Sequence, residues 1–274
     1  MRNYWSVFVN TLTLGKEGQS FLGAGWVEGL LRLAPASYRR QMALTVLSWS
    51  PHYFYRGMNP EYSRLSHAEF TAREFERNKS TREKLCAAVL RPSLGSDQVV
   101  LDYGCGPGFL ARSVSPHVRQ VYAVDLSAGV IECARILNGA PNITFLPTAQ
   151  LDEIPDAAVD LVYSFAVIQH VTDAVFREIL ATMLRKLKPG GQLLIHIVLD
   201  DAHWRREEDW KGDRSVTGRL RLKYALNCFR RTAADVTGML ESAGCREIVI
   251  RPMQEWCPEP FDDVCTQHLV SALK

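Results

Sequence analysis

Short runs of apolar, mostly β-branched residues alternate with helix-like segments from about residue 98 to the end of the chain. Runs of this kind are typical of strands buried on both faces, because a half-buried strand would alternate apolar and polar positions. Strands that alternate with helices predict a parallel, doubly wound α/β sheet. The predicted strands cover residues 99–101, 121–124, 143–146, 161–165, 193–198, 248–250 and 269–273.

Helices are expected from about residue 108, over 127–137, over 172–187 and over 232–242. In the third of these, Val175, Ile179, Met183 and Leu187 recur at intervals of four. Positions at that spacing share one face of a helix, so this face should lie on the sheet.

The pattern over residues 1–97 predicts instead a helical extension, with breaks at the prolines of positions 35, 51 and 60. Two Ser-x-x-Glu sequences, beginning at Ser66 and Ser80, have the spacing of capping boxes and predict two helix starts. A charged and aromatic insertion follows the fifth strand over about 200–231. Ligands of doubly wound folds bind beyond the carboxyl ends of the strands, so this insertion is expected to cap the crevice of a domain covering 98–274.

The strongest motif reads Asp-Tyr-Gly-Cys-Gly-Pro-Gly over residues 102–108, where the first strand turns into the first helix. Its glycines permit the backbone turn and the close approach of a ligand, and the helix N-terminus offers N–H groups to an anionic end. Counted from Gly104, a dinucleotide fingerprint would need glycine where Pro107 stands. Counted from Gly106, it ends in Ala111 and satisfies the relaxed form. The glycines alone therefore leave a nicotinamide-dependent oxidoreductase open.

Two acids near the turn narrow the ligand. Asp125 ends the second strand, about 20 residues after the first glycine, where a carboxylate accepts hydrogen bonds from ribose hydroxyls. Asp102 precedes the glycines, and its charge would repel a pyrophosphate and attract an ammonium. S-adenosylmethionine has the ribose and the ammonium and lacks phosphate.

These motifs, with Val-Asp-Leu-Val-Tyr-Ser at 159–164 and Leu-Lys-Pro-Gly-Gly at 187–191, resemble the class I S-adenosylmethionine-dependent methyltransferases. Within them the chain is similar to the small-molecule and natural-product group, and the resemblance covers about 98–274. It implies a Rossmann-like seven-stranded sheet with the last strand antiparallel. It also implies methyl transfer from S-adenosyl-L-methionine, with S-adenosyl-L-homocysteine as the product, to an oxygen, nitrogen or carbon of a largely apolar small molecule.

The resemblance also implies roles for individual residues. Asp102 would meet the methionine end of the cofactor, and Asp125 would hold the ribose. The remaining cofactor positions are Gly104 and Gly106 at the methionine and ribose, Leu126 and Gln150 at the adenine, and Ser164 and Phe165 at the sulfonium. Gln150 departs from the family pattern, which commonly has an aspartate there.

Other residues are candidates for the acceptor side. His170 follows the fourth strand and is the candidate general base, with a loop-bonding histidine as the alternative. Tyr53 and Tyr55 belong to an aromatic stretch that either lines the acceptor pocket or packs the extension onto the domain. Trp204 is a candidate lid residue with the same alternative of ordinary packing. His196, Asp200, Asp201 and His203 look like a metal set, but we expect no metal site.

The composition and net charge exclude few classes of function. The net charge of +2 favours neither a nucleic-acid nor a membrane partner, and no apolar stretch has the length of a membrane span. Seven cysteines without a Cys-x-x-Cys pair favour reduced thiols, so we expect a cytoplasmic protein. A homo-oligomer formed through the N-terminal helices is compatible with the pattern. A protein that binds S-adenosylmethionine without transferring methyl remains an alternative.

Overall fold

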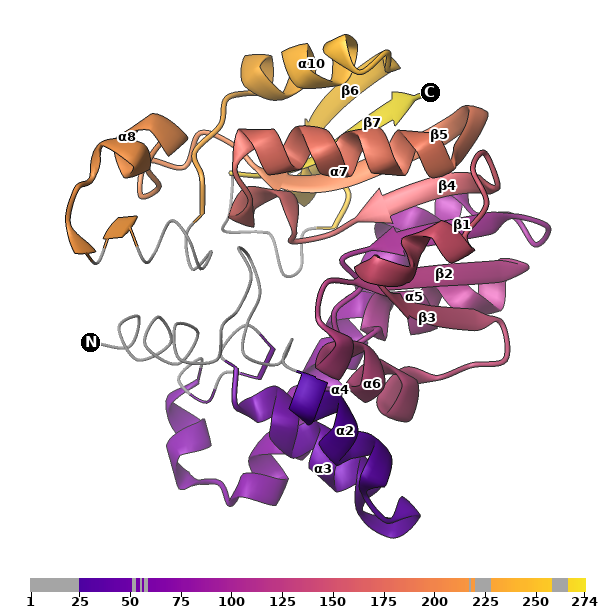
Figure 1. Ribbon diagram of the computed structural model, residues 1–274, viewed down its shortest axis with the longest axis vertical. Coiled ribbons are helices and arrows are strands. Elements are labelled where there is room, and N and C mark those ends of the chain that lie inside the picture. Colours follow the sequence, from indigo (N-terminus) through magenta and orange to yellow (C-terminus); the bar gives the residue numbers. More distant parts are fainter. Residues whose placement is uncertain are drawn as a thin grey trace.

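The computed structural model describes residues 25–50, 53, 54, 56, 59–216, 218, 219, 228–257 and 266–274. In this part of the chain the strands form one seven-stranded sheet of order β3-β2-β1-β4-β5-β7-β6 (Figure 1). Strands β1 to β5 pair in parallel, and β7 pairs antiparallel with both β5 and β6. The expected Rossmann-like sheet with an antiparallel last strand is confirmed. The strands are β1 Val99–Tyr103, β2 Gln120–Asp125, β3 Ile143–Pro147, β4 Val159–Ser164, β5 Leu187–Val198, β6 Arg246–Pro252 and β7 Gln267–Leu273.

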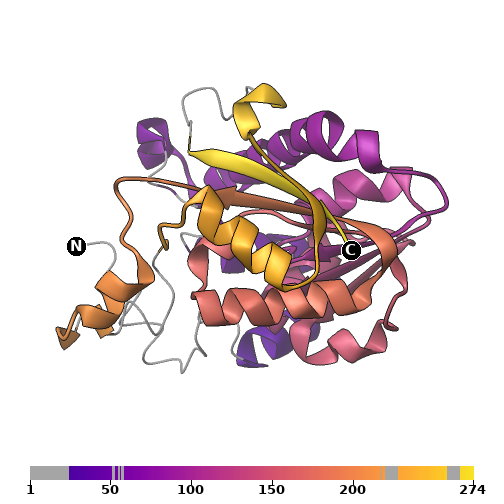
Figure 2. The same cartoon turned by 90° about the horizontal axis from the view of Figure 1, so that it is seen from above.

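Helices cover both faces of the sheet. The α-helices described are α2 Gly25–Leu33, α3 Ala36–Ser48, α4 His67–Leu85, α5 Phe109–Val114, α6 Ala128–Asn138, α7 Asp173–Lys186, α8 Glu207–Gly212 and α10 Ala233–Ser242. Figure 2 shows α7 and α10 on one side of the strands and α4 and α5 on the other. Alternate strand residues feed the two cores: Leu101 and Val162 pack toward α7, whereas Val100 and Leu161 pack toward α5.

The face of α7 that lies on the sheet overlaps the expected one at Ile179 and Met183, which pack in that core, but it is centred elsewhere. Its buried apolar residues are Phe176, Leu180, Met183 and Leu184, while Val175 and Ile179 are only half-buried. A strict interval of four drifts around a helix of 3.6 residues per turn, so the buried stripe follows intervals of three and four. Leu187 already belongs to β5.

Only one of the two predicted capping boxes begins a helix. The Ser66 hydroxyl accepts from the Glu69 N–H at 3.3 Å, and the Ser66 N–H donates to the Glu69 carboxylate at 2.8 Å. The prediction of a helix start at Ser80 was wrong, because α4 continues through it to Leu85. Buried residues on both sides of Ser80, including Phe75 and Leu85, hold α4 in place, and such packing outweighs a local capping signal.

The helical extension packs on the first helices of the sheet domain. Val27 and Leu31 of α2 and Leu44 and Leu47 of α3 share a buried cluster with Phe109, Val130, Cys133 and Leu137. The end of the extension goes further, because Leu85, Val89 and Leu90 belong to the core beneath α5. The expected domain boundary at residue 97 stays a prediction.

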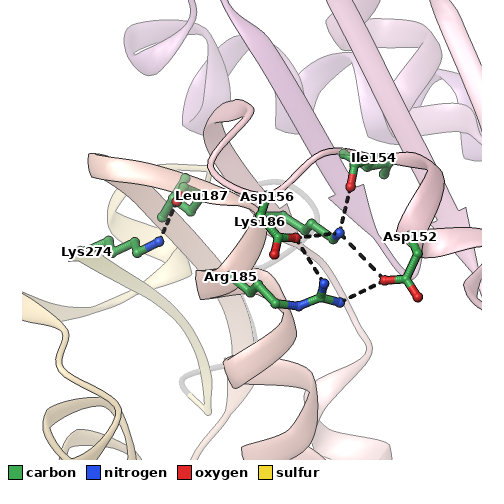
Figure 3. Close-up of polar contacts among 7 residues, drawn as sticks. All are labelled: Asp152, Ile154, Asp156, Arg185, Lys186, Leu187 and Lys274. Atoms are coloured by element: carbon green, nitrogen blue, oxygen red, sulfur yellow. Dashed lines mark hydrogen bonds and ion pairs between the residues drawn. The ribbon is translucent and has the colours of Figure 1, made fainter.

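A buried lysine fastens the end of α7 to the loop that precedes β4 (Figure 3). Lys186 is 1% exposed, and its ammonium donates to the Ile154 carbonyl at 2.6 Å and to the Asp156 carboxylate at 2.8 Å. Arg185 also donates to Asp156, at 2.9 Å. This network lies at the amino end of β4, and therefore away from the ligand crevice expected at the carboxyl ends. Within the described ranges, no helix is both long and apolar enough to span a membrane.

Candidate cofactor and methyl-transfer site

The glycine turn between β1 and α5 has the conformation that a closely bound ligand requires. Gly104 and Gly106 have φ values of 79° and 53°, in the left-handed region. A Cβ on Gly104 would collide with the side chain of Val167, which follows β4. A Cβ on Gly106 would lie 3.5 Å from Cε1 of Tyr53. The turn is therefore enclosed by the loop after β4 on one side and by the N-terminal extension on the other.

Asp125 is fastened to this turn. Its carboxylate accepts from the Gly106 N–H at 2.9 Å and from the Ser127 N–H at 3.0 Å. Burial raises its pKa, and these backbone donors oppose that rise. Two backbone bonds use part of the accepting capacity of a carboxylate, which has about four lone-pair sites. The rest suits the two hydroxyls of a ribose.

The acid does not cap the next helix. Ser127 serves that purpose, because its hydroxyl accepts from the Val130 N–H at 3.4 Å. Leu126, between the two, is 42% exposed. An exposed leucine beside the acid expected to hold the ribose could give an adenine an apolar surface.

Asp102 lies at the end of β1 and is 2% exposed. Its Oδ2 atom has no hydrogen-bond partner in the described part of the chain. Burial and, after it, the nearby charge of Asp125 raise the pKa of this carboxyl to about 8, although Arg82 and Tyr163 act in the opposite direction. A buried carboxyl without a full set of partners is expensive for a protein. A cationic ligand that enters the site would remove that cost.

Arg82 of α4 is a candidate site residue that the sequence motifs do not indicate. Its charge lowers the pKa values of both Asp102 and His196, so it lies near the ends of β1 and β5. Its guanidinium makes no hydrogen bond to a described residue, and burial lowers its pKa. Nothing in the sequence around Arg82 distinguishes it from the other basic residues of α4.

Tyr53 lies beside the glycine turn. Besides its contact with the glycine turn, its pKa is raised by burial and then by the charge of Asp125. The ring is therefore close to the acid expected to hold the ribose. Tyr55, the second aromatic residue named from the sequence, is outside the described residues.

The loop after β4 is held by β5. The Ala166 N–H donates to Nδ1 of His196 at 3.2 Å, and Ala166 has a φ of 60°. The rings of Phe165 and His196 are stacked, with centroids 5.7 Å apart. The hydroxyl of Ser164 donates to the Tyr103 carbonyl at 2.8 Å, so it fixes β4 to β1. Of the two residues expected at the sulfonium, Ser164 is bonded to the backbone of β1, and Phe165 packs against the buried ring of His196.

His196 stays neutral in this position. Burial lowers its pKa to about 4, and the nearby charge of Arg82 acts in the same direction. A neutral ring can accept the Ala166 N–H through Nδ1, whereas a protonated ring could not.

His170 ends the short 3₁₀ helix η8, Ile168–His170, and is half-buried. Its Nδ1 lies 3.4 Å from Sγ of Cys228, at the far end of the insertion. His170 follows β4 and His196 belongs to β5, so both lie on the β4–β5 side of the glycine turn.

The insertion begins at the carboxyl end of β5. In Figure 1, α8 lies beyond the end of the sheet at which the β4 arrow ends. Glu207 of α8 accepts from the Asp173 N–H at 2.6 Å, which fixes the insertion to the start of α7. Trp204 is half-buried beside this helix, and none of its described contacts reaches the glycine turn.

Two other expectations concern Gln150 as an adenine partner and the possible metal set between residues 196 and 203. Gln150 lies in the 3₁₀ helix Thr148–Glu153 after β3 and is exposed, and β3 pairs with β2 up to Asp125. The histidines and acids between 196 and 203 do not converge: His203 is 94% exposed and pairs with Asp201, whereas His196 is buried. No group of three metal-ligating side chains is found among the described residues.

Known proteins resemble this chain in sequence and in fold. A family model described as a methyltransferase domain matches residues 73–248. An N-demethylindolmycin N-methyltransferase of Streptomyces griseus is 37% identical over 100 residues, which are 35% of this chain and 42% of that protein. A malonyl-[acyl-carrier protein] O-methyltransferase of Serratia marcescens is 30% identical over 126 residues, 45% of this chain and 48% of its own length. The chain thus spans about half the length of the curated relatives it matches.

Solved structures agree on the fold. An S-adenosylmethionine-dependent methyltransferase from Mesorhizobium loti has a TM-score of 0.52 and 21% identity, over 70% of this chain and 98% of that one. A phosphoethanolamine N-methyltransferase of Haemonchus contortus, solved with S-adenosylhomocysteine, has a TM-score of 0.50 and 19% identity, over 69% of this chain and 52% of that one. The family match covers more than half of the sequence, and the sheet order and glycine turn agree with it. This chain belongs to the class I S-adenosylmethionine-dependent methyltransferases.

Proposed function

We propose that this protein transfers the methyl group of S-adenosyl-L-methionine to an oxygen, nitrogen or carbon of a largely apolar small molecule of secondary metabolism. The observation that carries the proposal is the pair of acids on the two sides of the glycine turn, Asp102 buried and Asp125 half-buried. Asp102 has an unpartnered oxygen in the described chain, and Asp125 has accepting capacity left over. This donor set fits a ligand with an ammonium and a ribose, and it is unfavourable for a pyrophosphate.

Each part of the cofactor has a counterpart in this chain. Asp102 would take the ammonium, and Arg82 has the charge to take the carboxylate. Asp125 would hold the ribose, and Leu126 would lie against the adenine. Gly104 lets Val167 close on the turn, and Gly106 lets the ring of Tyr53 approach it.

The bound cofactor would supply an electrophilic methyl group, and the protein would supply position and a site without bulk water. Phe165, fixed by His196, gives the crevice an apolar wall. Holding two reactants in a reactive orientation is worth about 7–11 kcal/mol. No covalent intermediate on a side chain is required.

His170 is proposed as the general base that removes a proton from a hydroxyl or ammonium acceptor. It stands on the turn directly after β4, beside the wall formed by Phe165 and His196. General base assistance contributes typically 10²–10⁴-fold in rate. With a hydroxyl acceptor, His170→Gln should lower kcat by about that factor and leave cofactor affinity unchanged.

An apolar small acceptor is supported by the aromatic residues around the crevice, Tyr53 and Phe165 among the described ones. It is supported further by the Streptomyces griseus relative, whose name specifies N-methylation of N-demethylindolmycin. The homo-oligomer expected through the N-terminal helices also stays a proposal. Its support is the exposure of Trp26, Leu33 and Tyr38 on α2 and α3, which sedimentation analysis would test.

The test is turnover. The protein is incubated with S-adenosylmethionine and a panel of apolar amines, phenols and enols, and S-adenosylhomocysteine is measured by mass spectrometry, with Asp125→Ala as the control variant. Acceptor-dependent product that Asp125→Ala does not form supports the proposal. Tight binding of S-adenosylmethionine without turnover on any acceptor would instead indicate a binding protein.

A further inference from the structure

The backbone at Ala166 is held by a side chain of the neighbouring strand. The ladder between β4 and β5 ends at the pair of Ser164 and Ile195. Two residues beyond Ser164, the Ala166 N–H donates to Nδ1 of His196 at 3.2 Å. The imidazole thus takes the place that a backbone carbonyl has within a ladder. His196 therefore extends the connection between the two strands into the loop after β4.

The direction of this hydrogen bond follows from the chemistry of the two groups. A backbone N–H can only donate, so Nδ1 of His196 is unprotonated and the proton of the neutral ring is on Nε2. The surroundings agree with this, because His196 is 5% exposed and burial lowers its pKa to about 4. At neutral pH the ring is therefore a constant acceptor for Ala166.

Ala166 has a backbone conformation that needs such a contact. Its φ of 60° lies in the left-handed region, which a residue with a Cβ rarely adopts. Residues held in this region are strained, and they cluster where a binding or catalytic site requires their geometry. Ala166 is itself exposed, so tight packing around its methyl group does not impose the conformation. The hydrogen bond to His196 is the described contact that stabilises it.

The left-handed residue sets the direction of the chain on both sides. Before it, the ring of Phe165 is stacked on that of His196, with an interplanar angle of 9°. After it, Val167 closes over Gly104, where an added Cβ would collide with the valine side chain. The Val167 carbonyl also accepts from the His170 N–H at 3.0 Å and so begins η8. A changed backbone at this one residue would therefore displace the whole border of the site at which the sulfonium is expected.

We propose that His196 is a positioning residue for methyl transfer: its Nδ1 holds Ala166 in the left-handed conformation and so keeps the two flanking side chains beside the methyl group of the bound cofactor. The inference rests on the proposed function. It adds to that function a residue that acts through the backbone and not on the reactants. The acceptor nitrogen carries this role, and the flat ring adds only the contact with Phe165.

The direct test is NMR of ¹⁵N-labelled full-length protein at neutral pH with S-adenosylhomocysteine added. The parent should show an unprotonated Nδ1 on His196 and a strong Overhauser effect between the amide and α protons of Ala166, which marks a positive φ. His196→Asn, whose Oδ1 also accepts, should keep this effect. His196→Phe, which keeps a ring against Phe165 but has no acceptor, should lose it. His117→Phe, at a half-buried histidine of the 3₁₀ helix Ser115–His117 before β2, is the matched control.

Kinetics with whichever panel acceptor is active separate positioning from packing. His196→Phe should lower kcat about 100-fold, the order of loss when reacting groups are slightly misplaced. Its affinity for S-adenosylmethionine should stay close to the parent's, because Asp102 and Asp125 are unchanged. Adding Ala166→Gly to His196→Phe should restore most of kcat, since glycine adopts a positive φ without strain. A histidine that only fills space would not respond to a change at Ala166.

A protonated Nδ1 in the parent, a positive φ at Ala166 in His196→Phe, or a double variant no faster than His196→Phe would overturn the inference. If His196→Phe fails to fold, Ala166→Val replaces it, because a β-branched side chain opposes the left-handed conformation while His196 stays in place. Parent-like kcat of folded Ala166→Val would then overturn the inference. A parent that forms no S-adenosylhomocysteine with any acceptor would contradict the proposed function alone, because the NMR signals are read without turnover.

Discussion

The carboxylate of Asp125 accepts a hydrogen bond from the backbone N–H of Gly106 at 2.9 Å, so the acid that ends β2 is joined to the turn that ends β1. The same carboxylate accepts from the Ser127 N–H at 3.0 Å. Asp125 therefore shapes the turn, and we propose that it also binds the ribose, so a variant must separate the two roles.

Asp125→Ala should weaken S-adenosylmethionine binding by about 1.5–3 kcal/mol, or roughly 10- to 150-fold, because ribose hydroxyls lose a charged acceptor. Asp125→Asn keeps one amide oxygen for the backbone donors and should lose less. Isothermal titration calorimetry gives both affinities, and circular dichroism checks the fold. Parent-like binding by a folded Asp125→Ala would refute the ribose assignment.

Cofactor affinity should depend on pH through Asp102. With its pKa raised to about 8 by burial, the carboxyl of the free protein is protonated between about pH 4 and 8. A ligand ammonium favours the ionised form, so binding should release a proton and strengthen as pH rises toward 8, by at most about tenfold per unit. Above that, the cofactor's own α-amino group, with an ordinary pKa of about 7.7–8.0, loses its charge and affinity should fall.

Calorimetry at pH 6 and pH 7.5, in buffers of different ionisation enthalpy, measures both the affinity and the proton release. Asp102→Asn is the control, since it cannot ionise and should show neither effect below pH 7.5. Equal parent affinities at the two pH values, without proton release, would show that Asp102 does not meet the ammonium. The free parent should also lose stability as the pH rises from about 4 to 8. Over that range Asp102 stays protonated in the folded protein, whereas the unfolded chain has released this proton.

Gly104 should tolerate no side chain. Gly104→Ala places a Cβ against Val167 at a φ of 79°, which combines backbone strain of about 1 kcal/mol with overpacking of about 1–3 kcal/mol. Gly190 has a φ of 75° and nothing within 4 Å of an added Cβ, so Gly190→Ala isolates the strain. Urea unfolding should show the larger loss for Gly104→Ala, with partial recovery in the double variant with Val167→Ala. Equal losses in the two glycine variants would mean that the loop after β4 does not press on the turn.

Tyr53 borders the glycine turn, where we expect the cofactor and not the acceptor. Because its ring borders Gly106, Tyr53→Ala should weaken S-adenosylmethionine binding by about tenfold, and Tyr53→Phe should keep most of the affinity, since the ring supplies the contact. Tyr38→Ala, at a tyrosine that is 67% exposed on α3, is the control. Unchanged cofactor affinity combined with a higher KM for an active acceptor would return Tyr53 to the acceptor pocket.

The fold was predictable because strand runs such as 121–124 and 193–198 are apolar throughout, and the turn at 102–108 marks the start of the first helix. The predictions that differ from the structure rested on local sequence patterns. Ser80 has the spacing of a capping box, but the core residues of α4 on both sides keep the helix continuous. On α7, the intervals of four between Val175 and Met183 hid the stripe that starts at Phe176.

The candidate site was predictable only where its residues sit on a motif. Asp102 and Asp125 follow from the turn and the strand spacing. Arg82 and Cys228 do not follow from a motif. Each belongs to a segment remote in sequence from its neighbour at the candidate site, Asp102 for Arg82 and His170 for Cys228. Tertiary packing alone determines which of several basic residues or cysteines arrives there.

The most direct test of the central claim is a calorimetric comparison of S-adenosylmethionine with nicotinamide adenine dinucleotide, at pH 7.5 and under matched salt. We predict one S-adenosylmethionine bound per chain, about tenfold or more tighter than the dinucleotide, a difference of at least about 1.4 kcal/mol, because an ammonium stabilises the ionised form of Asp102 whereas a pyrophosphate gives it no counter-charge. Tighter binding of the dinucleotide, or no binding of S-adenosylmethionine by folded protein, would contradict it.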